Sequence, residues 1–179
     1  MCKQEVNMKN LVIYYSRKGQ NYVNGSIKDL KKGNAEVIAE DIKKAVGADL
    51  FQVETVKPYS ADYTTCTNEA AEELRNNARP VLKKYLKDIS VYENVFIVGP
   101  CWWGTYPMAM FTCLEGLDFN GKNVFACMTH EGSGMGNSEH DLKKMLKGAS
   151  FGKSLAVVGH AVNDSEIKIQ KWAESSVNA

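Results

Sequence analysis

The hydrophobic residues of this chain fall into short continuous runs, separated by longer stretches in which they recur every three or four positions. The runs lie at residues 11–15, 51–53, 95–98, 124–128 and 155–158. Four of them are nearly uninterrupted, as in parallel strands that are covered on both faces. The second run lies within residues 49–54, which partly alternate between polar and apolar types. That segment is therefore expected to form an edge strand.

The stretches between the runs predict amphipathic helices. Their apolar positions with three- or four-residue spacing are Ile38, Ile42 and Val46; Ala70, Leu74 and Ala78; Leu142, Met145 and Leu146; and Ile169, Trp172, Ala173 and Val177. Pro107 suits the first turn of a further helix over about residues 108–117. Fivefold alternation of strand and helix predicts a three-layer α/β fold, with a five-stranded parallel sheet of order 2-1-3-4-5 and helices on both faces. We expect one domain at residues 9–179, preceded by a disordered extension at 1–8.

Composition and charge exclude several classes of function. The 44% hydrophobic and 24% charged residues are ordinary for a globular protein. The formal net charge is +1 and the basic residues are scattered, so nucleic-acid binding is not expected. No apolar stretch approaches the about 18 residues of a membrane span, and the first residues lack the apolar block of a signal peptide. We therefore expect a cytoplasmic protein without membrane contacts.

The five cysteines and three histidines do not form a recognisable ligand set. The cysteines are odd in number and form no C-x-x-C pair, and the histidines fall in different segments without metal-binding spacing. The sequence thus predicts neither a disulfide framework nor a metal site.

In an open parallel sheet, ligands bind beyond the carboxyl ends of the strands at the switch point between strands 1 and 3. The first strand is followed by Ser16, Arg17 and Lys18, and then, after a polar stretch, by Gly33, Asn34 and Ala35 at a predicted helix start. Hydroxyl, amide and backbone N–H groups at a helix N-terminus suit a phosphate monoester. Clusters of serine, glycine and asparagine are also ordinary turn and cap residues, so this loop alone does not decide between the two interpretations.

The loop after the third strand carries two adjacent tryptophans. Its candidate binding residues are Pro100, Cys101, Trp102, Trp103, Gly104 and Thr105. Large aromatic residues at the binding edge of a sheet suit a planar ligand, because offset stacking adds to the burial of ring area. One of the two tryptophans could instead pack the loop onto the sheet without weakening this prediction.

The loop after the fourth strand is rich in glycine. Its candidate binding residues are Thr129, His130, Glu131, Gly132, Ser133 and Gly134. Glycines let backbone amides approach a ligand closely. A dinucleotide fingerprint is excluded, because Asn137 stands where its last glycine belongs and the segment follows a late strand. A lone histidine or cysteine in such loops more often packs or hydrogen-bonds than reacts, so we assign no catalytic residue.

Taken together, these motifs resemble the flavodoxin-like, FMN-binding proteins of the short-chain type. The resemblance rests on Ser-Arg and Gly-Asn around the first loop, on Pro-x-Trp-Trp-Gly-Thr-x-Pro-Met at residues 100–108, and on Thr-x-x-Gly-Ser-Gly at 129–134. Residues 62–63 and 73–80 also match sequences typical of that group. The resemblance implies a flavodoxin-like fold that holds FMN non-covalently. The first, third and fourth loops would hold the phosphate, the ring face and the pyrimidine edge respectively.

The first loop departs from the pattern of this family. Its members typically run Ser-Arg-Thr-Gly-Asn-Thr without a break, whereas in this chain Ser16-Arg17 and Gly33-Asn34 are separated by an insertion. Either residues 18–21 replace the usual loop, or the insertion bulges out and Gly33-Asn34-Ala35 closes the site. We favour the second arrangement, with residues 22–32 as a surface excursion, because Gly33-Asn34 directly precedes an amphipathic helix. Ala35 stands where threonine is usual, so one hydroxyl is missing.

The resemblance implies two alternative functions. One is an electron carrier that docks on redox partner proteins; the other is an FMN-dependent NAD(P)H oxidoreductase that reduces a small-molecule acceptor such as a quinone, azo or nitro compound. The lack of a nicotinamide-binding motif favours the carrier, whereas the near-neutral charge argues against it, because flavodoxin-like carriers are usually acidic. A cofactor-free receiver domain is disfavoured, since it needs clustered acids where Ser16-Arg17 stand and an aspartate where Pro100-Cys101-Trp102 stand.

Overall fold

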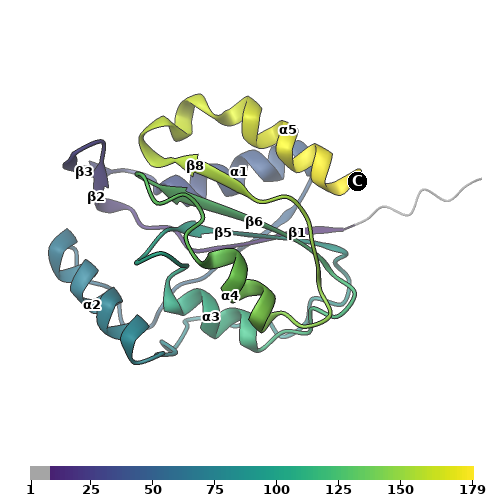
Figure 1. Cartoon of the computed structure of the whole chain (residues 1–179), viewed down its shortest axis with the longest axis horizontal. Coiled ribbons are helices and arrows are strands. Elements are labelled where there is room, and N and C mark those ends of the chain that lie inside the picture. Colours follow the sequence, from purple (N-terminus) through teal and green to yellow (C-terminus); the bar gives the residue numbers. More distant parts are fainter. Residues whose placement is uncertain (1–8) are drawn as a thin grey trace, which may run out of the picture.

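A computed structural model describes residues 9–179, and the extension predicted at 1–8 lies outside the described residues. A parallel sheet lies between two layers of helices (Figure 1). Helices α1 (Asn34–Val46) and α5 (Glu166–Val177) pack on one face. Helices α3 (Met108–Glu115) and α4 (Ser138–Met145) pack on the other. Helix α2 (Tyr63–Arg75) stands beside this second layer and buries only Cys66 and Ala70.

The order of the main sheet confirms the sequence prediction. Strands β4 (Asp49–Gln52), β1 (Asn10–Tyr14), β5 (Asn94–Pro100) and β6 (Asn123–His130) are neighbours in that order, and all pairs are parallel. Strand β4 forms one edge, as its alternating pattern predicts. The fifth position is shared by β7 (Ser150–Phe151) and β8 (Leu155–Val158), which both pair with β6. Between these two pairings the chain has one more residue on the β7–β8 side than on β6, and this interruption was not predicted.

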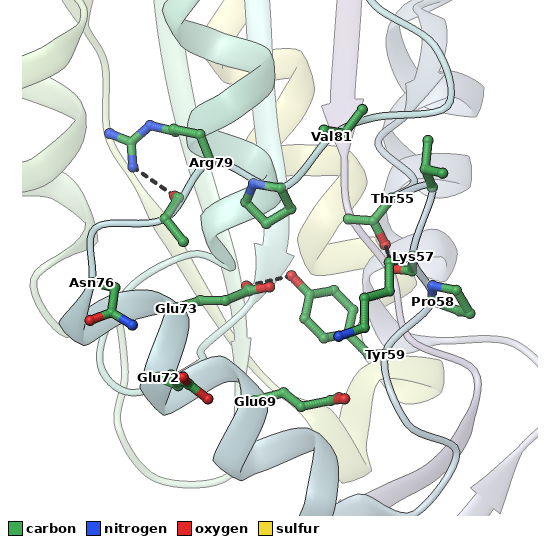
Figure 2. A pocket seen from close by; sticks show the side chains of 13 residues that line it. Thr55, Lys57, Pro58, Tyr59, Glu69, Glu72, Glu73, Asn76, Arg79 and Val81 are labelled. Atoms are coloured by element: carbon green, nitrogen blue, oxygen red, sulfur yellow. Dashed lines mark hydrogen bonds between the residues drawn. The ribbon is translucent and has the colours of Figure 1, made fainter.

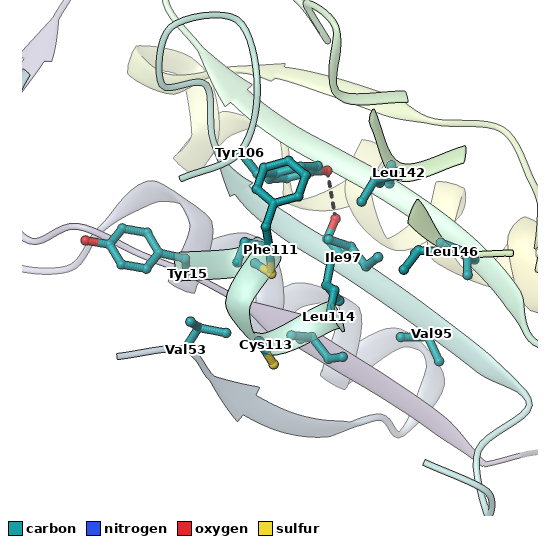
Figure 3. Close-up of a cluster of buried hydrophobic side chains, with 14 of the residues drawn as sticks. Tyr15, Val53, Val95, Ile97, Tyr106, Phe111, Cys113, Leu114, Leu142 and Leu146 are labelled. Carbon is teal, nitrogen blue, oxygen red and sulfur yellow. Dashed lines mark hydrogen bonds between the residues drawn. The ribbon is translucent and has the colours of Figure 1, made fainter. Parts of the chain in front are cut away.

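Two apolar clusters form the core, one on each face of the sheet. The interior strand β1 is buried along its whole length, as the continuous apolar run requires. Figure 3 shows the cluster beneath α3, in which the Tyr106 hydroxyl donates to the Ile97 carbonyl oxygen at 3.1 Å. The same hydroxyl lies 2.9 Å from the Cys127 carbonyl oxygen. The single hydroxyl hydrogen of this buried phenol is therefore shared between carbonyl groups of β5 and β6.

A row of asparagines crosses the amino-terminal ends of the three interior strands. The Asn94 side chain, 1% exposed, donates to Asn10 Oδ1 at 2.9 Å. Asn123 donates to Asn94 Oδ1 at 3.0 Å, and Asn10 donates to the Val46 carbonyl oxygen at 2.8 Å. Because an amide both donates and accepts, the three side chains link β1, β5 and β6 in one hydrogen-bonded row.

The insertion in the first loop forms a separate antiparallel hairpin of β2 (Gly19–Val23) and β3 (Ser26–Leu30). Asn24 and Gly25 occupy its turn with φ of 46° and 90°, as a two-residue type I′ turn requires. The Asn-Gly pair between β-forming residues was the sequence signal for this hairpin. The sequence predicted only an excursion at this position, without strands.

Candidate functional site

Two adjoining cavities of about 330 Å³ each lie at the carboxyl ends of β1, β5 and β6. Together they form one cleft, because they share the lining residues Asn21, Tyr63, Cys101, Trp102 and Ser133. One end, called the α1 end, reaches Asn34 and Gly159. The other, called the tryptophan end, lies between Trp103 and helix α2. The cleft occupies the switch point of the sheet, where the topology predicts a ligand.

At the α1 end, Ser16 and Gly33 are in contact although the hairpin separates them in sequence. A Cβ at Gly33 would lie 2.1 Å from Ser16 Oγ and 2.6 Å from the Arg17 carbonyl oxygen, so the approach requires glycine. Ser16 Oγ accepts a hydrogen bond from the Glu36 N–H at 3.0 Å. The first amides of a helix have no intrahelical acceptor, which leaves the N–H group of Asn34, a residue that lines the cleft, available to a ligand. This geometry supports closure of the loop by Gly33-Asn34-Ala35.

At the tryptophan end, the chain reverses in a tight turn. Trp102 and Thr105 exchange backbone hydrogen bonds of 2.8 and 3.3 Å, with φ of 55° at Trp103 and 85° at Gly104. A positive φ is uncommon at a bulky residue and costs about 1–3 kcal/mol. The Trp103 indole is 58% exposed, and its Nε1 donates to the Thr67 carbonyl oxygen of α2 at 2.9 Å.

Trp102 has a different role from its neighbour. Its ring lies edge-on to Tyr15 and Tyr59, with centroid distances of 5.2 and 5.0 Å. Trp102 therefore packs the loop against the core while it lines the cleft. Trp102 is thus the tryptophan that packs the loop onto the sheet. Trp103 is the exposed tryptophan.

The loop after β6 is pressed against the tryptophan turn. The Asn137 N–H donates to the Gly104 carbonyl oxygen at 2.6 Å, and a Cβ at Gly136 would lie 2.2 Å from that oxygen. His130 accepts a hydrogen bond from the Gly132 N–H at its Nδ1 (2.9 Å) and so shapes its own loop. The Glu131 carboxylate lies at the α1 end, where its Oε2 is 2.7 Å from His160 Nδ1.

The hairpin bridges the two sides of the cleft. Gln20 Oε1 accepts from the Tyr63 N–H at 2.8 Å, and the Tyr22 and Tyr63 rings are stacked at 6.5 Å between centroids. At the opposite side, the Asn24 N–H at the hairpin tip donates to Glu131 Oε2 at 3.2 Å. Asn21 and Tyr22 line the cleft. The insertion is therefore part of the cleft wall and not only the surface excursion that we expected.

Most of the predicted site residues line this cleft. They are Arg17, Asn34, Pro100, Cys101, Trp102, Trp103, Gly104, Thr129, His130, Glu131, Gly132 and Ser133. Gly33, Ala35 and Gly134 are not among the lining residues, although the first two form the start of α1. Ser16 and Lys18 line a separate hollow beside Glu36, and Thr105 turns away, since its buried hydroxyl donates to Asp141 at 2.7 Å.

Sequence reasoning missed the residues contributed by the hairpin, by α2 and by the turn after β8. These are Asn21, Tyr22, Tyr63, Cys66, Thr67, Ala70 and Gly159. Only Tyr63 carried a signal, because it belongs to a segment that matches the family. The others reach the cleft through tertiary packing.

The cleft carries opposite charges at its two ends. Arg17 lines the tryptophan end, where its guanidinium donates to the carbonyl oxygens of Gln20 and Ala61. Burial raises the pKa of the neighbouring Cys66 thiol, and Arg17 opposes this shift. Glu131 lies at the α1 end. Among residues 9–179, no group of three or more histidine, cysteine or acidic side chains is arranged to hold a metal ion.

A larger cavity of about 610 Å³ lies outside this cleft, between α2 and the segments at 55–59 and 78–81 (Figure 2). Glu69, Glu72 and Glu73 of α2 line it, and Glu73 accepts a hydrogen bond from the Tyr59 hydroxyl at 2.6 Å. Burial raises the pKa of Glu73. Tyr59 also packs against Trp102, so this cavity lies behind one wall of the cleft.

A doubly wound parallel sheet with a cleft at its switch point defines a class of ligand-binding α/β proteins. Within that class, the sequence profile of the flavodoxin family matches residues 9–176. The chain belongs to the flavodoxin family. No curated protein matches the sequence significantly.

Solved structures with the same fold include flavoproteins from three bacteria. A flavoprotein of Bacteroides eggerthii is 27% identical with a TM-score of 0.74, covering 94% of this chain and 98% of that one. One of Bacteroides uniformis is 24% identical with a TM-score of 0.72, covering 92% and 97%. A Lactobacillus acidophilus flavoprotein, solved in complex with FMN, is 18% identical with a TM-score of 0.61, covering 88% and 97%. Within residues 9–179, no helix combines the length and apolar character needed to cross a membrane.

Proposed function

We propose that the protein holds FMN non-covalently in the cleft and transfers electrons through it. The observation that carries this proposal is the pair of adjoining cavities, which extend from Asn34 at the start of α1 to the exposed Trp103 ring. A phosphate dianion and an aromatic ring system joined by a polar chain match these two ends. FMN has this construction, and membership of the flavodoxin family supports it.

The chain's own residues would divide the work of binding. The Asn34 N–H at the start of α1 would hold the phosphate, because a helix N-terminus favours an anion. Trp102, Trp103 and Tyr63 would contact the ring system, and the glycine-rich loop after β6 would approach its edge. When bound, the flavin supplies the redox chemistry, and the protein orients it and sets its electronic environment.

Apolar groups around the ring would lower its reduction potential, whereas a nearby positive charge would raise it. Aromatic surroundings disfavour the additional negative charge of a reduced ligand. The Arg17 guanidinium at the tryptophan end would favour that charge. Glu131 lies at the other end of the cleft and is therefore not expected to dominate the potential.

Titration of the full chain with three flavins tests this proposal. We expect FMN to bind one to one, and riboflavin and FAD to bind more weakly, because the α1 end offers a terminal-phosphate site and no adenosine fingerprint is present. Calorimetry or the visible absorption spectrum would report binding. Equal affinity for riboflavin and FMN would contradict the assignment of the phosphate to α1.

Two roles remain open for the bound flavin. The first is that of a cytoplasmic electron carrier that docks on redox partner proteins, as the absence of a nicotinamide motif suggests. The second is an FMN-dependent NAD(P)H oxidoreductase acting on quinone, azo or nitro compounds. The hairpin favours this second role, because it bridges the cleft from Tyr63 to Glu131 and restricts the approach of a large partner.

Steady-state kinetics separates the two roles. A reductase oxidises NADH or NADPH with a quinone as acceptor in the absence of any other protein. A carrier is reduced only when a flavoprotein or iron–sulfur reductase is supplied. Rapid turnover with purified protein, pyridine nucleotide and quinone alone would exclude a pure carrier.

A further inference from the structure

The larger cavity outside the cleft has one apolar wall, formed by the segments at 55–59 and 78–81. The Val56 N–H donates to the Val81 carbonyl oxygen at 2.9 Å and joins the two segments. Both valine side chains line the cavity, and they are 57% and 63% exposed. The cavity volume of about 610 Å³ lies within the range of small-molecule sites. The apolar body of a ligand would cover this wall and remove it from water.

The opposite wall belongs to α2 and carries carboxylates in fixed positions. Glu69 Oε2 accepts a hydrogen bond from the Ser60 N–H at 2.9 Å, and Glu73 Oε2 accepts one from the Tyr59 hydroxyl at 2.6 Å. The second oxygen of each carboxylate accepts no hydrogen bond from residues 9–179. Glu69 and Glu73 are four residues apart and therefore lie on one face of the helix. Two oriented acceptor oxygens are thus available to a ligand.

The charge around the cavity is negative on balance. Glu72 adds a third carboxylate to the lining, and the positive charges of the lining are those of Lys57 and Arg79. Arg79 forms an ion pair with Glu115, which does not line this cavity. Lys57 is therefore the principal charge that opposes the three carboxylates.

The three carboxylates destabilise the helix that carries them. Like charges four residues apart repel one another, as Glu69 and Glu73 do. Glu72 and Glu73 also lie in the last turn of α2, where the helix dipole disfavours negative charge. Burial raises the pKa of Glu73, and the Glu69 charge acts in the same direction. A cation in the cavity would offset this repulsion, whereas an anion would add to it.

We propose that this cavity binds a small organic amine, in which an ammonium group is attached to an apolar body. The ammonium group donates to the second oxygens of Glu69 and Glu73, and the apolar body covers Val56 and Val81. The Tyr59 ring lies between the two walls (Figure 2) and adds an aromatic surface that attracts a cation. The site shares no lining residue with the two cavities of the cleft, so it does not depend on the proposed function.

The experiment compares three probes that share one apolar body. Octylamine is a cation at neutral pH, octanol is uncharged and octanoate is an anion. Their binding to the full chain is measured by isothermal titration calorimetry, once without FMN and once with an excess of FMN. The linear alkyl chain has no ring that could stack on the tryptophans of the cleft. The measurement without FMN tests the site whether or not the protein binds a flavin.

We expect octylamine to bind one to one, about tenfold or more tightly than octanol, and octanoate to show no binding. Glu73→Gln should weaken octylamine binding by about tenfold or more, because glutamine keeps the size of the side chain but not its charge. Lys57→Gln should strengthen octylamine binding, because it removes the opposing charge. Glu174→Gln is the matched control, since it neutralises an exposed carboxylate on α5 and should change nothing. Thermal unfolding would show that each variant is folded.

A second pair of variants tests the apolar wall. Val81→Ser should weaken octylamine and octanol binding by a similar factor of about three to ten, because both complexes lose buried apolar area. Val91→Ser is its control, since Val91 is 58% exposed and does not line the cavity. Equal binding of octylamine by both valine variants would contradict the assignment of the apolar wall.

Three other outcomes overturn the site. Equal affinity for octylamine and octanol would mean that the carboxylates do not select a cation. Loss of octylamine binding in the presence of FMN would place the amine in the cleft. No saturable binding of octylamine up to about 3 mM would mean that the cavity does not bind amines. Failure of the protein to bind FMN would refute the proposed function and leave this test unaffected.

Discussion

The close contact between Ser16 and Gly33 closes the first loop beneath the hairpin. We predict that a side chain at position 33 lowers the stability of the fold. In Gly33→Ala, the new methyl carbon would lie 2.1 Å from Ser16 Oγ, 2.6 Å from the Arg17 carbonyl oxygen and 2.8 Å from its carbon. Gly33 has φ of −70°, a conformation that alanine adopts readily. The substitution therefore tests steric contact alone. Main-chain atoms of Arg17 cannot move away as the end of a flexible side chain could.

The magnitude follows from three contributions. Overpacking of this kind costs about 1–3 kcal/mol. Displacement of Ser16 Oγ from the Glu36 N–H costs about a further 0.5–1.5 kcal/mol. The lower entropy of the unfolded chain returns about 0.4–1 kcal/mol. A net loss of about 0.5–4 kcal/mol corresponds to a fall in Tm of roughly 1–16 °C for a chain of this size.

Thermal and urea unfolding followed by circular dichroism would measure this loss. Gly116→Ala is the matched control, because Gly116 has φ of −81° and the nearest atom to its added Cβ is 3.9 Å away. We also expect Gly33→Ala to weaken FMN binding, since it displaces the start of α1. Adding Ser16→Ala to the Gly33→Ala variant should restore only part of its stability, because the clash between residue 33 and the Arg17 main chain persists. If Gly33→Ala and Gly116→Ala were equally stable, the proposed closure of the loop would be wrong.

Three further predictions concern the ring, a buried acid and the hairpin. Bound FMN should quench tryptophan fluorescence, and Trp103→Ala should reduce both quenching and affinity; if quenching, affinity and reduction potential were all unchanged, the ring would lie elsewhere. Burial raises the pKa of Asp41 despite Lys44 at 3.7 Å, so its folded-state pKa exceeds the unfolded value and ionisation destabilises the fold. Asp41→Asn should therefore raise Tm at pH 7, with a gain that shrinks as pH falls through the usual carboxyl range; a gain independent of pH would contradict this. Replacing residues 22–32 by a short glycine bridge should keep FMN affinity within about tenfold, about 1.4 kcal/mol, whereas a larger loss would show that the cleft wall formed by the hairpin contributes substantially to binding.

The sheet was predictable because buried parallel strands consist of continuous apolar runs. The run at 95–98 falls within β5, and the alternating segment at 49–54 contains the edge strand β4. Strand β7 was not predicted, because two residues carry no periodic signal. The hairpin was also missed, although its Asn24-Gly25 turn has a sequence signature.

The candidate site was predictable to the extent that it follows the strands directly. Loops after the first, third and fourth predicted strands meet because parallel strands end at the same edge. Tyr22 and Cys66 reach the same cleft from the hairpin and from α2, and no local pattern shows that approach. The direction of the Glu131 side chain depends on Asn24 and His160, which are distant in sequence. Tertiary contacts therefore decide which polar groups face the ligand.

The row of asparagines at the amino-terminal ends of the strands favours one alignment of the strands during folding. Parallel strands lack the short turn that fixes the pairing of a hairpin, so a shift along one strand is a natural folding error. A shift of one residue would move a strand by about 3.3 Å and break the amide links among Asn10, Asn94 and Asn123. It would also change the position of the Trp102–Thr105 turn relative to the start of α1. The three asparagine side chains at the edge opposite the cleft thus help to fix the alignment of the strands, and with it the distance between the α1 end and the tryptophan end of the cleft.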